Sequence, residues 1–298
     1  MVKLNLEIPH GFLDEEVRSG YVVTSDMKAI WAVELDLLAE LDKMCRNYNL
    51  RYCVAAGTLL GAIRHRGFIP WDDDIDIYML RKDYDQLMIL ANQFTFPYFL
   101  QSTYTEKKLY RPHAQLRNSN TTGYIDEDKY RDINKGIFID IFPLDGVSEL
   151  EEENRKQRKI YDRYNRILSK FNTAMDYKPE TSIIKKFKKK LKKEIFAVIK
   201  KEYLFKKFEN NLRKYSQQNV SIWGNRTIVF ECPKSRRPIN DWQNLTSAKF
   251  EFLNVPIPIN YDGILKQQYG DYMKFPRNKK GSMHGTLTIS TEYSYTKK

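Results

Sequence analysis

The sequence is poor in the features that mark secreted and membrane-spanning proteins. Its three cysteines, Cys45, Cys53 and Cys232, are an odd number without CxxC spacing, so neither a disulfide framework nor a cysteine zinc site is indicated. No run approaches the roughly 18 consecutive apolar residues of a membrane span. Five charged side chains occupy residues 1–16, where a signal peptide needs an apolar stretch. We therefore expect a cytoplasmic protein whose cysteines are small core residues.

Acidic residues are fewer than basic ones, 38 against 50, which gives a formal net charge of +12. An excess of this size would ordinarily suggest nucleic acid as a partner. However, residues 181–206 contain ten Lys and two Glu, a net charge of +8, so the rest of the chain carries only +4. Because the excess is one local segment, we do not expect nucleic acid as a partner.

The chain has enough apolar material for a folded core. It has 298 residues, of which 42% are hydrophobic, and it includes 20 Tyr and 16 Phe. A disordered chain would be poorer in aromatic residues, and large amphipathic rings suit a protein with a ligand cleft. The sequence therefore predicts a globular protein.

Hydrophobic periodicity divides the chain into three parts. Residues 1–148 are expected to form a mixed core of the α/β (α+β) class. Its expected elements are a helix at 25–48 with Ser25 as N-cap, a buried strand at 52–56, a turn at Gly57 and Thr58 before a second helix, a strand at 74–80, a helix at 83–92, and strands at 95–101, 113–117 and 136–142. Residues 149–221 are predicted to be a basic helical insertion with a break near Pro179. Residues 222–298 are predicted to be a C-terminal lobe that completes the cleft, with a helix at 262–269 ended by Gly270.

Four of the five residues from 72 to 76 are aspartates. On a strand, Asp72, Asp74 and Asp76 would project from one face while Ile75 and Ile77 pack into the core. Like charges this close repel unless a cation lies between them, and oxygen ligands suit Mg²⁺ or Mn²⁺. The alternative is a solvated acidic turn, but the apolar alternation favours a half-buried strand and therefore a metal site.

A lone carboxylate, Asp140, stands inside the apolar run GIFIDIFP at residues 136–143. Burial of an unpaired charge costs several kcal/mol, so Asp140 should meet a cation or a strong donor. One alternative is a salt bridge to an arginine. If its strand neighbours the strand of Asp74, however, three acidic groups converge, and Asp140 could take the proton from an attacking hydroxyl.

Gly57 and Thr58 precede a predicted helix and offer backbone N–H groups, a helix dipole and a hydroxyl to an anion. Such a pair is more often simple capping. Here one loop connects it to the aspartates, and that loop contains Arg64, His65 and Arg66, cations suited to phosphate. His65 could equally be an ordinary loop histidine.

The run AGTLLGAIRHRGFIPWDDDIDI at residues 56–77 resembles the LicD family of phosphocholine transferases of bacterial surface glycans, related to the fukutin group of ribitol-phosphate transferases. Similar family features occur at residues 115–121 and 136–145, and more loosely at 255–256, 269–272 and His284. The resemblance implies a nucleotidyltransferase-like fold, metal at the Asp-x-Asp pair Asp74 and Asp76, and CDP-choline or a similar CDP-alcohol as donor. Because fifteen residues separate Thr58 from Asp74, more than in many members of the superfold, Asp72 is a further candidate ligand.

The resemblance implies an enzyme, a phosphotransferase for substituted phosphate groups. A hydroxyl of a cell-surface glycan precursor, in teichoic acid, lipopolysaccharide or capsule, would attack the phosphorus that carries the alcohol and expel CMP. Asp140 would be the base, while Arg64, Arg117 and the turn at residues 57–58 would hold phosphate. One alternative is a nucleotidyltransferase that uses a nucleoside triphosphate and releases pyrophosphate. Another is a non-catalytic basic adaptor for membrane or nucleic acid, which would leave the buried aspartates unexplained.

The Lys-rich segment at 181–206 combines an apolar helical stripe with dense positive charge. The stripe consists of Ile184, Phe187, Leu191, Ile195 and Val198. Either it packs on the protein's own core and the lysines are simply solvated, or the helix lies on an anionic membrane surface. The second reading fits a glycan acceptor carried on a lipid, and it predicts peripheral attachment to the inner face of the cell membrane.

Overall fold

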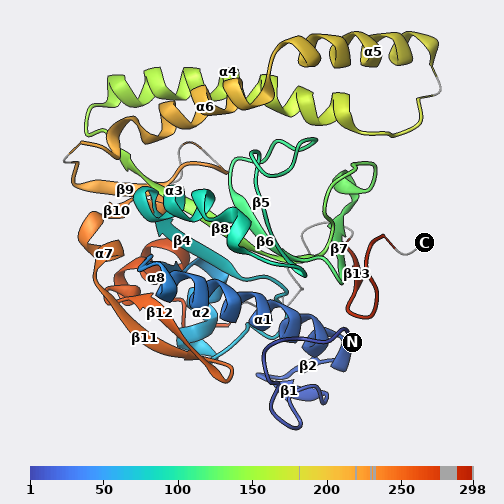
Figure 1. Cartoon of the computed structure of the whole chain (residues 1–298). Coiled ribbons are helices and arrows are strands. Elements are labelled where there is room, and N and C mark those ends of the chain that lie inside the picture. The colour runs from blue at the N-terminus through green and yellow to red at the C-terminus, as the bar shows by residue number, and fades with distance from the viewer. Residues whose placement is uncertain (181, 219, 229, 231–232, 276–286, 297–298) are drawn as a thin grey trace.

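The computed structural model describes residues 1–180, 182–218, 220–228, 230, 233–275 and 287–296 (Figure 1). A mixed sheet flanked by helices lies at the centre, which confirms the predicted α/β (α+β) class. Cys45 and Cys53 are buried free thiols, as predicted. Cys232 and His284 lie outside the described residues. Among the helices of the described residues, none is both long and apolar enough to cross a bilayer.

The central sheet has seven strands among the described residues. They are β3 (Cys53–Val54), β4 (Asp76–Leu80), β5 (Tyr98–Gln101), β6 (Ala114–Asn118), β8 (Ile137–Val147), β9 (Ile222–Asn225) and β10 (Arg237–Pro238). One edge of β8 pairs in parallel with β4, which pairs in turn with β3. The other edge of β8 pairs with β6 along its first half and with β9 along its second half. The order across the middle of the sheet is therefore β3, β4, β8, β6 and β5.

Three helices from the first half of the chain pack against the central sheet and against elements next to it. They are α1 (Ser25–Asn47), α2 (Ala56–Arg64) and α3 (Arg81–Ile89). The predicted N-cap of α1 is wrong by one residue, because the Thr24 hydroxyl, with extended backbone, accepts the Met27 N–H at 3.2 Å. The predicted turn at residues 57–58 is also wrong, since both residues already belong to the first turn of α2. The helix expected at 83–92 begins and ends earlier, and a short 3₁₀ turn follows it at Ala91–Gln93.

The predicted helical insertion consists of three helices, α4 (Glu151–Met175), α5 (Ile183–Val198) and α6 (Lys201–Leu212). A non-helical stretch separates α4 from α5 around Pro179, as predicted. Figure 1 shows the three helices as a layer at the top of the molecule. A second apolar cluster joins α4 and α6 to the loop at Tyr110, and it includes Phe171, Phe205 and Phe208.

The remaining elements form small sheets and the C-terminal region. They are β1 (Glu16–Arg18) with β2 (Tyr21–Val23), β7 (Thr122–Ile125) with β13 (Leu287–Ser290), β11 (Leu245–Phe250) with β12 (Leu253–Pro258), α7 (Ile239–Gln243) and α8 (Tyr261–Tyr269). As predicted, Gly270 ends α8, with a φ of +70° that favours glycine. Because β9 and β10 belong to the central sheet, the C-terminal region shares that sheet with the first half of the chain.

A buried ion network connects the insertion to the sheet. The Arg81 guanidinium donates from Nη2 to Asp145 Oδ2 at 2.6 Å and from Nη1 to Glu209 Oε1 at 3.3 Å, and all three side chains are buried. Burial by itself would lower the pKa of Arg81, but the two carboxylates raise it overall. Asp145 lies on β8 and Glu209 on α6, so this network joins two layers.

Replacing Asp145 by Ala should lower the free energy of unfolding by about 3–5 kcal/mol, because Arg81 would remain buried without its main partner. Urea denaturation followed by circular dichroism measures the change. Asp85→Ala is the matched control: Asp85 contacts the same guanidinium at 3.4 Å but is partly exposed, so its loss should cost about 1 kcal/mol or less. Equal costs for the two variants would show that the network does not join the layers.

Candidate active site

The aspartates stand where the loop after α2 enters β4. The strand begins at Asp76, so the prediction that Asp72 and Asp74 are strand residues is wrong. The loop is nevertheless fixed, because Trp31 Nε1 on α1 donates to the Asp72 carbonyl at 2.9 Å. The Asp76 N–H donates to the Thr58 hydroxyl at 2.8 Å, and the Asp76 carbonyl accepts the Ala55 N–H at 2.9 Å. The acidic loop is thus attached to both α1 and the start of α2.

Asp140 lies directly opposite Asp76 in the parallel pairing of β4 with β8. Its N–H donates to the Ile75 carbonyl at 2.9 Å. The predicted neighbourhood of the two strands is therefore correct, and it brings Asp140 to Asp74 and Asp76.

The carboxylates repel one another. Burial, followed by the charges of neighbouring aspartates, raises the pKa of Asp74 and of Asp76 well above the usual range. The cluster reaches Glu34 on α1, which is only 2% exposed and whose pKa is raised by burial and by Asp73, Asp74, Asp72 and Asp140. Such crowding is the electrostatic condition under which a bound cation is stabilising.

Asp140 differs from its neighbours. Burial would raise its pKa, but His113, Gln115 and Arg111 together lower it. Gln115 Nε2 donates to Asp140 Oδ1 at 2.8 Å, and His113 Nε2 lies 3.1 Å from the same oxygen. The expected strong donor is thus an amide together with an imidazole, and the alternative of an arginine salt bridge is not what the structure shows. The Asp140 carboxylate is held ionised and in a fixed orientation.

His113 and Gln115 were not identified from the sequence. A signal was present, because alternate residues of a strand share a face, and positions 113, 115 and 117 all carry polar side chains in the strand predicted at 113–117. That pattern places them on one face, but the sequence alone does not say that this face meets Asp140.

The predicted phosphate site at Gly57 and Thr58 lies at the N-terminus of α2, which has no side-chain cap. A Cβ atom on Gly57 would lie 2.8 Å from Asp72 Oδ2, so the glycine allows the Asp72 carboxylate to approach the helix. The Thr58 hydroxyl accepts the Asp76 N–H. The pair therefore brings the start of the helix against the acidic loop, and the dipole of that helix favours an anion there.

Arg64 and His65 lie at the other end of α2. Arg64 donates from Nη1 to the Tyr272 carbonyl at 2.8 Å and from Nε to His65 Nε2 at 3.0 Å. Burial and the nearby Arg64 and Arg18 lower the pKa of His65 to about 4. The His65 imidazole is therefore neutral at neutral pH, and Arg64 is the cation of the pair. Substrate binding by His65 stays a prediction.

Tyr269, at the end of α8, was not identified as a site residue although it lies in the loose family feature at 269–272. Burial and then Asp76, Asp72 and Asp74 raise the pKa of its phenol. The residue is 45% exposed. Tyr269 therefore borders the acidic cluster on the side of the C-terminal region.

Arg117, predicted to hold phosphate, is only 1% exposed. Its guanidinium donates to Gln101 Oε1 at 2.7 Å, to the Gly136 carbonyl at 2.6 Å and to Gln115 Oε1. Because these acceptors are inside the protein, the structure does not place Arg117 as a direct phosphate ligand. It orients Gln115, which in turn donates to Asp140.

The carboxylates of the acidic cluster are the candidate ligands for a metal ion. Within the described residues, no three His, Cys, Asp or Glu side chains form a ready-made metal site. Mg²⁺ commonly binds through one or two carboxylates and completes its shell with water and substrate phosphates. The crowded pair Asp74 and Asp76, with Asp72 adjacent, fits a cation of this kind that binds together with a phosphate-bearing substrate.

Comparisons with known proteins point to one family. Residues 49–200 match the family described as LicD/FKTN/FKRP, nucleotidyltransferase domain. The chain is 28% identical over 262 residues to the lipopolysaccharide cholinephosphotransferase LicD of Haemophilus influenzae, a match that covers 84% of this chain and 92% of that protein. An uncharacterized protein of Rickettsia prowazekii is 36% identical over 81 residues, 27% of this chain and 29% of that protein. An uncharacterized protein of Rickettsia typhi is 36% identical over 70 residues, 24% and 22% of the two chains.

Replacing Asp74 or Asp76 by Asn should leave the metal-free melting temperature unchanged or higher, because each change removes a repelling charge. Added Mn²⁺ should raise the melting temperature of the wild-type protein, since a cation that binds only the folded state stabilises it. The variants should gain less, and about 1 kcal/mol of lost stabilisation corresponds to roughly 2–4 °C. Differential scanning fluorimetry with and without Mn²⁺ measures both effects.

Asp162→Asn, which removes an exposed carboxylate on α4, is the control and should respond to Mn²⁺ as the wild type does. A full Mn²⁺ response in both Asp74→Asn and Asp76→Asn would rule out these residues as the ligands.

Proposed function

The chain belongs to the LicD/FKTN/FKRP family, and we propose that it is a metal-dependent phosphotransferase that moves phosphocholine, or a similar alcohol phosphate, from a CDP-alcohol to a glycan hydroxyl. The observation that carries this proposal is the meeting of Asp74 and Asp76 with Asp140 across the parallel pair β4 and β8. Support for the transferred group and for a surface glycan as acceptor comes from the Haemophilus relative, a lipopolysaccharide cholinephosphotransferase that aligns over most of both chains. Teichoic acid and capsule precursors are acceptors of the same chemical class.

In the proposed reaction, an acceptor hydroxyl oxygen forms a bond to the phosphorus that carries the alcohol. The bond from that phosphorus to the CMP oxygen breaks, and the hydroxyl proton passes to Asp140. His113 and Gln115 hold the Asp140 carboxylate in position. Asp74 and Asp76, with Asp72 as a third candidate, would hold Mg²⁺ or Mn²⁺, which would neutralise charge on the diphosphate.

The α2 N-terminus would bind a phosphate oxygen of the donor. Arg64, at the C-terminal end of the same helix, would add a positive charge to the cleft. Fixed donors and a fixed base suit phosphoryl transfer, because positioning and electrostatic stabilisation supply most of the rate.

The rival reaction from the same fold attacks the α-phosphorus of a nucleoside triphosphate and releases pyrophosphate. The family domain is described as a nucleotidyltransferase domain, and the same carboxylates could serve it. A non-catalytic basic adaptor is disfavoured, because it gives no reason to crowd buried carboxylates at one point.

We also propose that α5 attaches the protein to an anionic membrane surface. Its apolar stripe faces solvent: Ile184 is 66% exposed, Phe187 67% and Val198 84%. The opposite face meets α4, where Phe196 packs edge-on against Phe171 at 5.4 Å and Lys189 pairs with Asp176. The alternative that the stripe packs on the protein's own core is therefore wrong.

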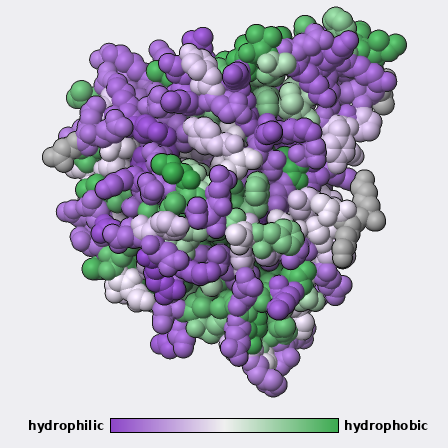
Figure 2. Space-filling view, viewed as in Figure 1, coloured by the Kyte–Doolittle hydropathy of each residue, from purple (hydrophilic) through white to green (hydrophobic). Residues whose placement is uncertain are grey.

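Lysines flank the exposed stripe of α5. Figure 2 shows hydrophobic side chains gathered over α5 beside hydrophilic ones. Lys188, Lys190 and Lys192 border the apolar residues on the helix surface, which is the arrangement of a helix that lies in a lipid interface. Each lysine near an anionic surface contributes about 1 kcal/mol. An acceptor built on a lipid carrier would be reached from this position.

The donor is tested with purified protein, Mg²⁺ and a panel of CDP-choline, CDP-glycerol, CDP-ribitol and nucleoside triphosphates. We expect CMP release from one CDP-alcohol and no pyrophosphate release. Asp74→Asn should lower the rate by about 100-fold or more, since the loss of metal binding removes several kcal/mol of transition-state stabilisation. Asp140→Asn should lose rate while donor binding, measured by calorimetry, persists. Pyrophosphate release from a triphosphate would overturn the proposed reaction.

Replacing Phe187 and Leu191 together by Ser should reduce co-sedimentation with phosphatidylglycerol vesicles by at least about tenfold, because each side chain loses on the order of 1.5–3 kcal/mol of apolar burial in the lipid. Binding of the wild-type protein should also fall as salt screens the lysines. Ile89→Ser is the matched control, since Ile89 is 74% exposed on α3. Equal sedimentation of the wild type and the double variant would exclude membrane attachment through α5.

A further inference from the structure

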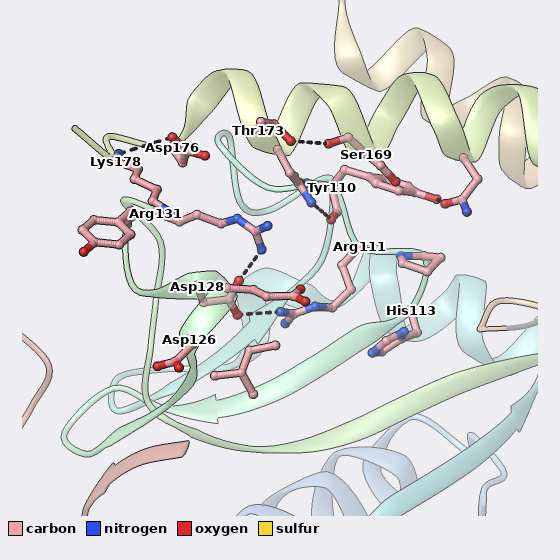
Figure 3. Close-up of a pocket in the computed structure, with 16 residues that line it drawn as sticks. Tyr110, Arg111, His113, Asp126, Asp128, Arg131, Ser169, Thr173, Asp176 and Lys178 are labelled. Atoms are coloured by element: carbon pink, nitrogen blue, oxygen red, sulfur yellow. Dashed lines mark hydrogen bonds and ion pairs between the residues drawn. The ribbon is translucent and has the colours of Figure 1, made fainter. Parts of the chain in front are cut away.

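A cavity of about 620 Å³ lies under α4, next to the candidate active site (Figure 3). Four segments line it: the α4 face that carries Asn165, Ser169 and Thr173, the stretch after α4 with Asp176 and Lys178, the loop at 110–113, and the loop at 125–131. Its volume lies within the range of roughly 300–1,000 Å³ that is common for small-ligand sites. Neither the acidic loop at residues 72–76 nor the start of α2 lines the cavity, so the cavity is separate from the acidic cluster.

One residue, His113, connects the cavity to the carboxylate of Asp140. His113 lines the cavity, and its Nε2 atom lies 3.1 Å from Asp140 Oδ1. In the sheet, β8 stands between β4 and β6, so Asp140 has the strand of Asp76 on one side and the strand that follows His113 on the other. The start of β4 contacts the α2 N-terminus, and β6 lies on the other side of β8. A ligand in the cavity would therefore reach Asp140 from the side that is away from the α2 N-terminus. This arrangement suits an in-line displacement, in which the attacking oxygen and the leaving oxygen lie on opposite sides of the phosphorus.

The charges of the lining indicate a neutral ligand. Arg111 and Arg131 both pair with one buried carboxylate, Asp128, at 3.0 Å in the case of Arg111. Counted together, the lining has three cations and four carboxylates, namely Arg111, Arg131, Lys178, Asp126, Glu127, Asp128 and Asp176. A site for a nucleotide or a free phosphate would need an excess of positive charge.

Hydrogen-bonding groups line the same space. Within the described part of the chain, two buried nitrogens on lining residues have no hydrogen-bond partner, Arg131 Nε and His113 Nδ1. The Ser169 and Thr173 side chains lie on the α4 wall, and Figure 3 shows them above the Arg131 and Arg111 guanidiniums. Buried nitrogens of this kind are costly unless a ligand or water satisfies them. Guanidiniums, hydroxyls and an imidazole around a cavity without an excess of positive charge suit a ligand with many hydroxyl groups.

We propose that this cavity binds the sugar of the glycan acceptor and directs one of its hydroxyls toward Asp140. The direction of transfer rests on the proposed function, whereas binding of a sugar does not. The insertion then has a part in catalysis, because α4 forms one wall of the acceptor site.

Substitutions on α4 that place a bulky side chain in the cavity test the proposal. Ser169 is an exposed residue that lines the cavity, and Lys170, its neighbour in sequence, is exposed but does not line it. Ser169→Trp should abolish binding of methyl glycosides of glucose, galactose and N-acetylgalactosamine, observed by saturation-transfer NMR on the wild-type protein, while Lys170→Trp should not. Thr173→Tyr fills the same cavity from the next turn and should have the same effect if Ser169→Trp is unstable.

In the transfer assay, Ser169→Trp should raise the acceptor KM at least about tenfold and leave the donor KM unchanged. Failure of all three glycosides to bind the wild type, or equal binding to Ser169→Trp, would overturn the proposal. A raised donor KM with an unchanged acceptor KM would assign the cavity to the donor alcohol instead, and so would also overturn it. Glycoside binding without turnover of any CDP-alcohol would reject the proposed function and keep the sugar site.

Discussion

The repulsion among Asp72, Asp74, Asp76 and Asp140 is the constraint on which the rest of the structure depends. Burial and the charges of the neighbouring aspartates raise the pKa of Asp74 and Asp76, and these carboxylates would separate if the backbone allowed it. The backbone prevents this, because α1 holds the acidic loop through Trp31, α2 holds the start of β4 through Thr58, and β8 pairs directly with β4. The fold thus keeps these carboxylates close together despite their repulsion.

The helical insertion packs against the sheet that carries these aspartates. The network of Arg81, Asp145 and Glu209 attaches α6 to the sheet, and the aromatic cluster around Phe208 attaches α4 to the loop before His113. With that support, α4 covers the cavity beside Asp140 and α5 presents its apolar stripe to solvent. The same insertion therefore forms one wall of the cavity beside Asp140 and carries the exposed apolar stripe of α5.

Periodicity in the sequence was sufficient for the elements whose apolar pattern is strong. The helix at 25–48, the strand around Asp140, the helical insertion with its break near Pro179 and the glycine that ends α8 were all predicted close to their observed positions. The second break, between α5 and α6, was not predicted. The errors fall at boundaries set by single hydrogen bonds. Thr24 rather than Ser25 caps α1. β4 begins only at Asp76, because the Asp72 carbonyl accepts from Trp31 on α1 and the Asp76 N–H donates to Thr58 on α2 instead of to a neighbouring strand.

By itself the sequence determined the acidic cluster, its connection to a helix N-terminus and the family resemblance, since all three are contained in one continuous run of 22 residues from 56 to 77. Only the tertiary structure decided which distant groups meet that run. The pairing of β8 with β6 brings His113 and Gln115 to Asp140, and it buries Arg117 among internal acceptors. Likewise, the packing of Phe196 on α4 decided that the apolar stripe of α5 faces outward. The physical reason is that periodicity reports which face of an element is apolar, whereas contacts between elements distant in sequence decide what that face meets.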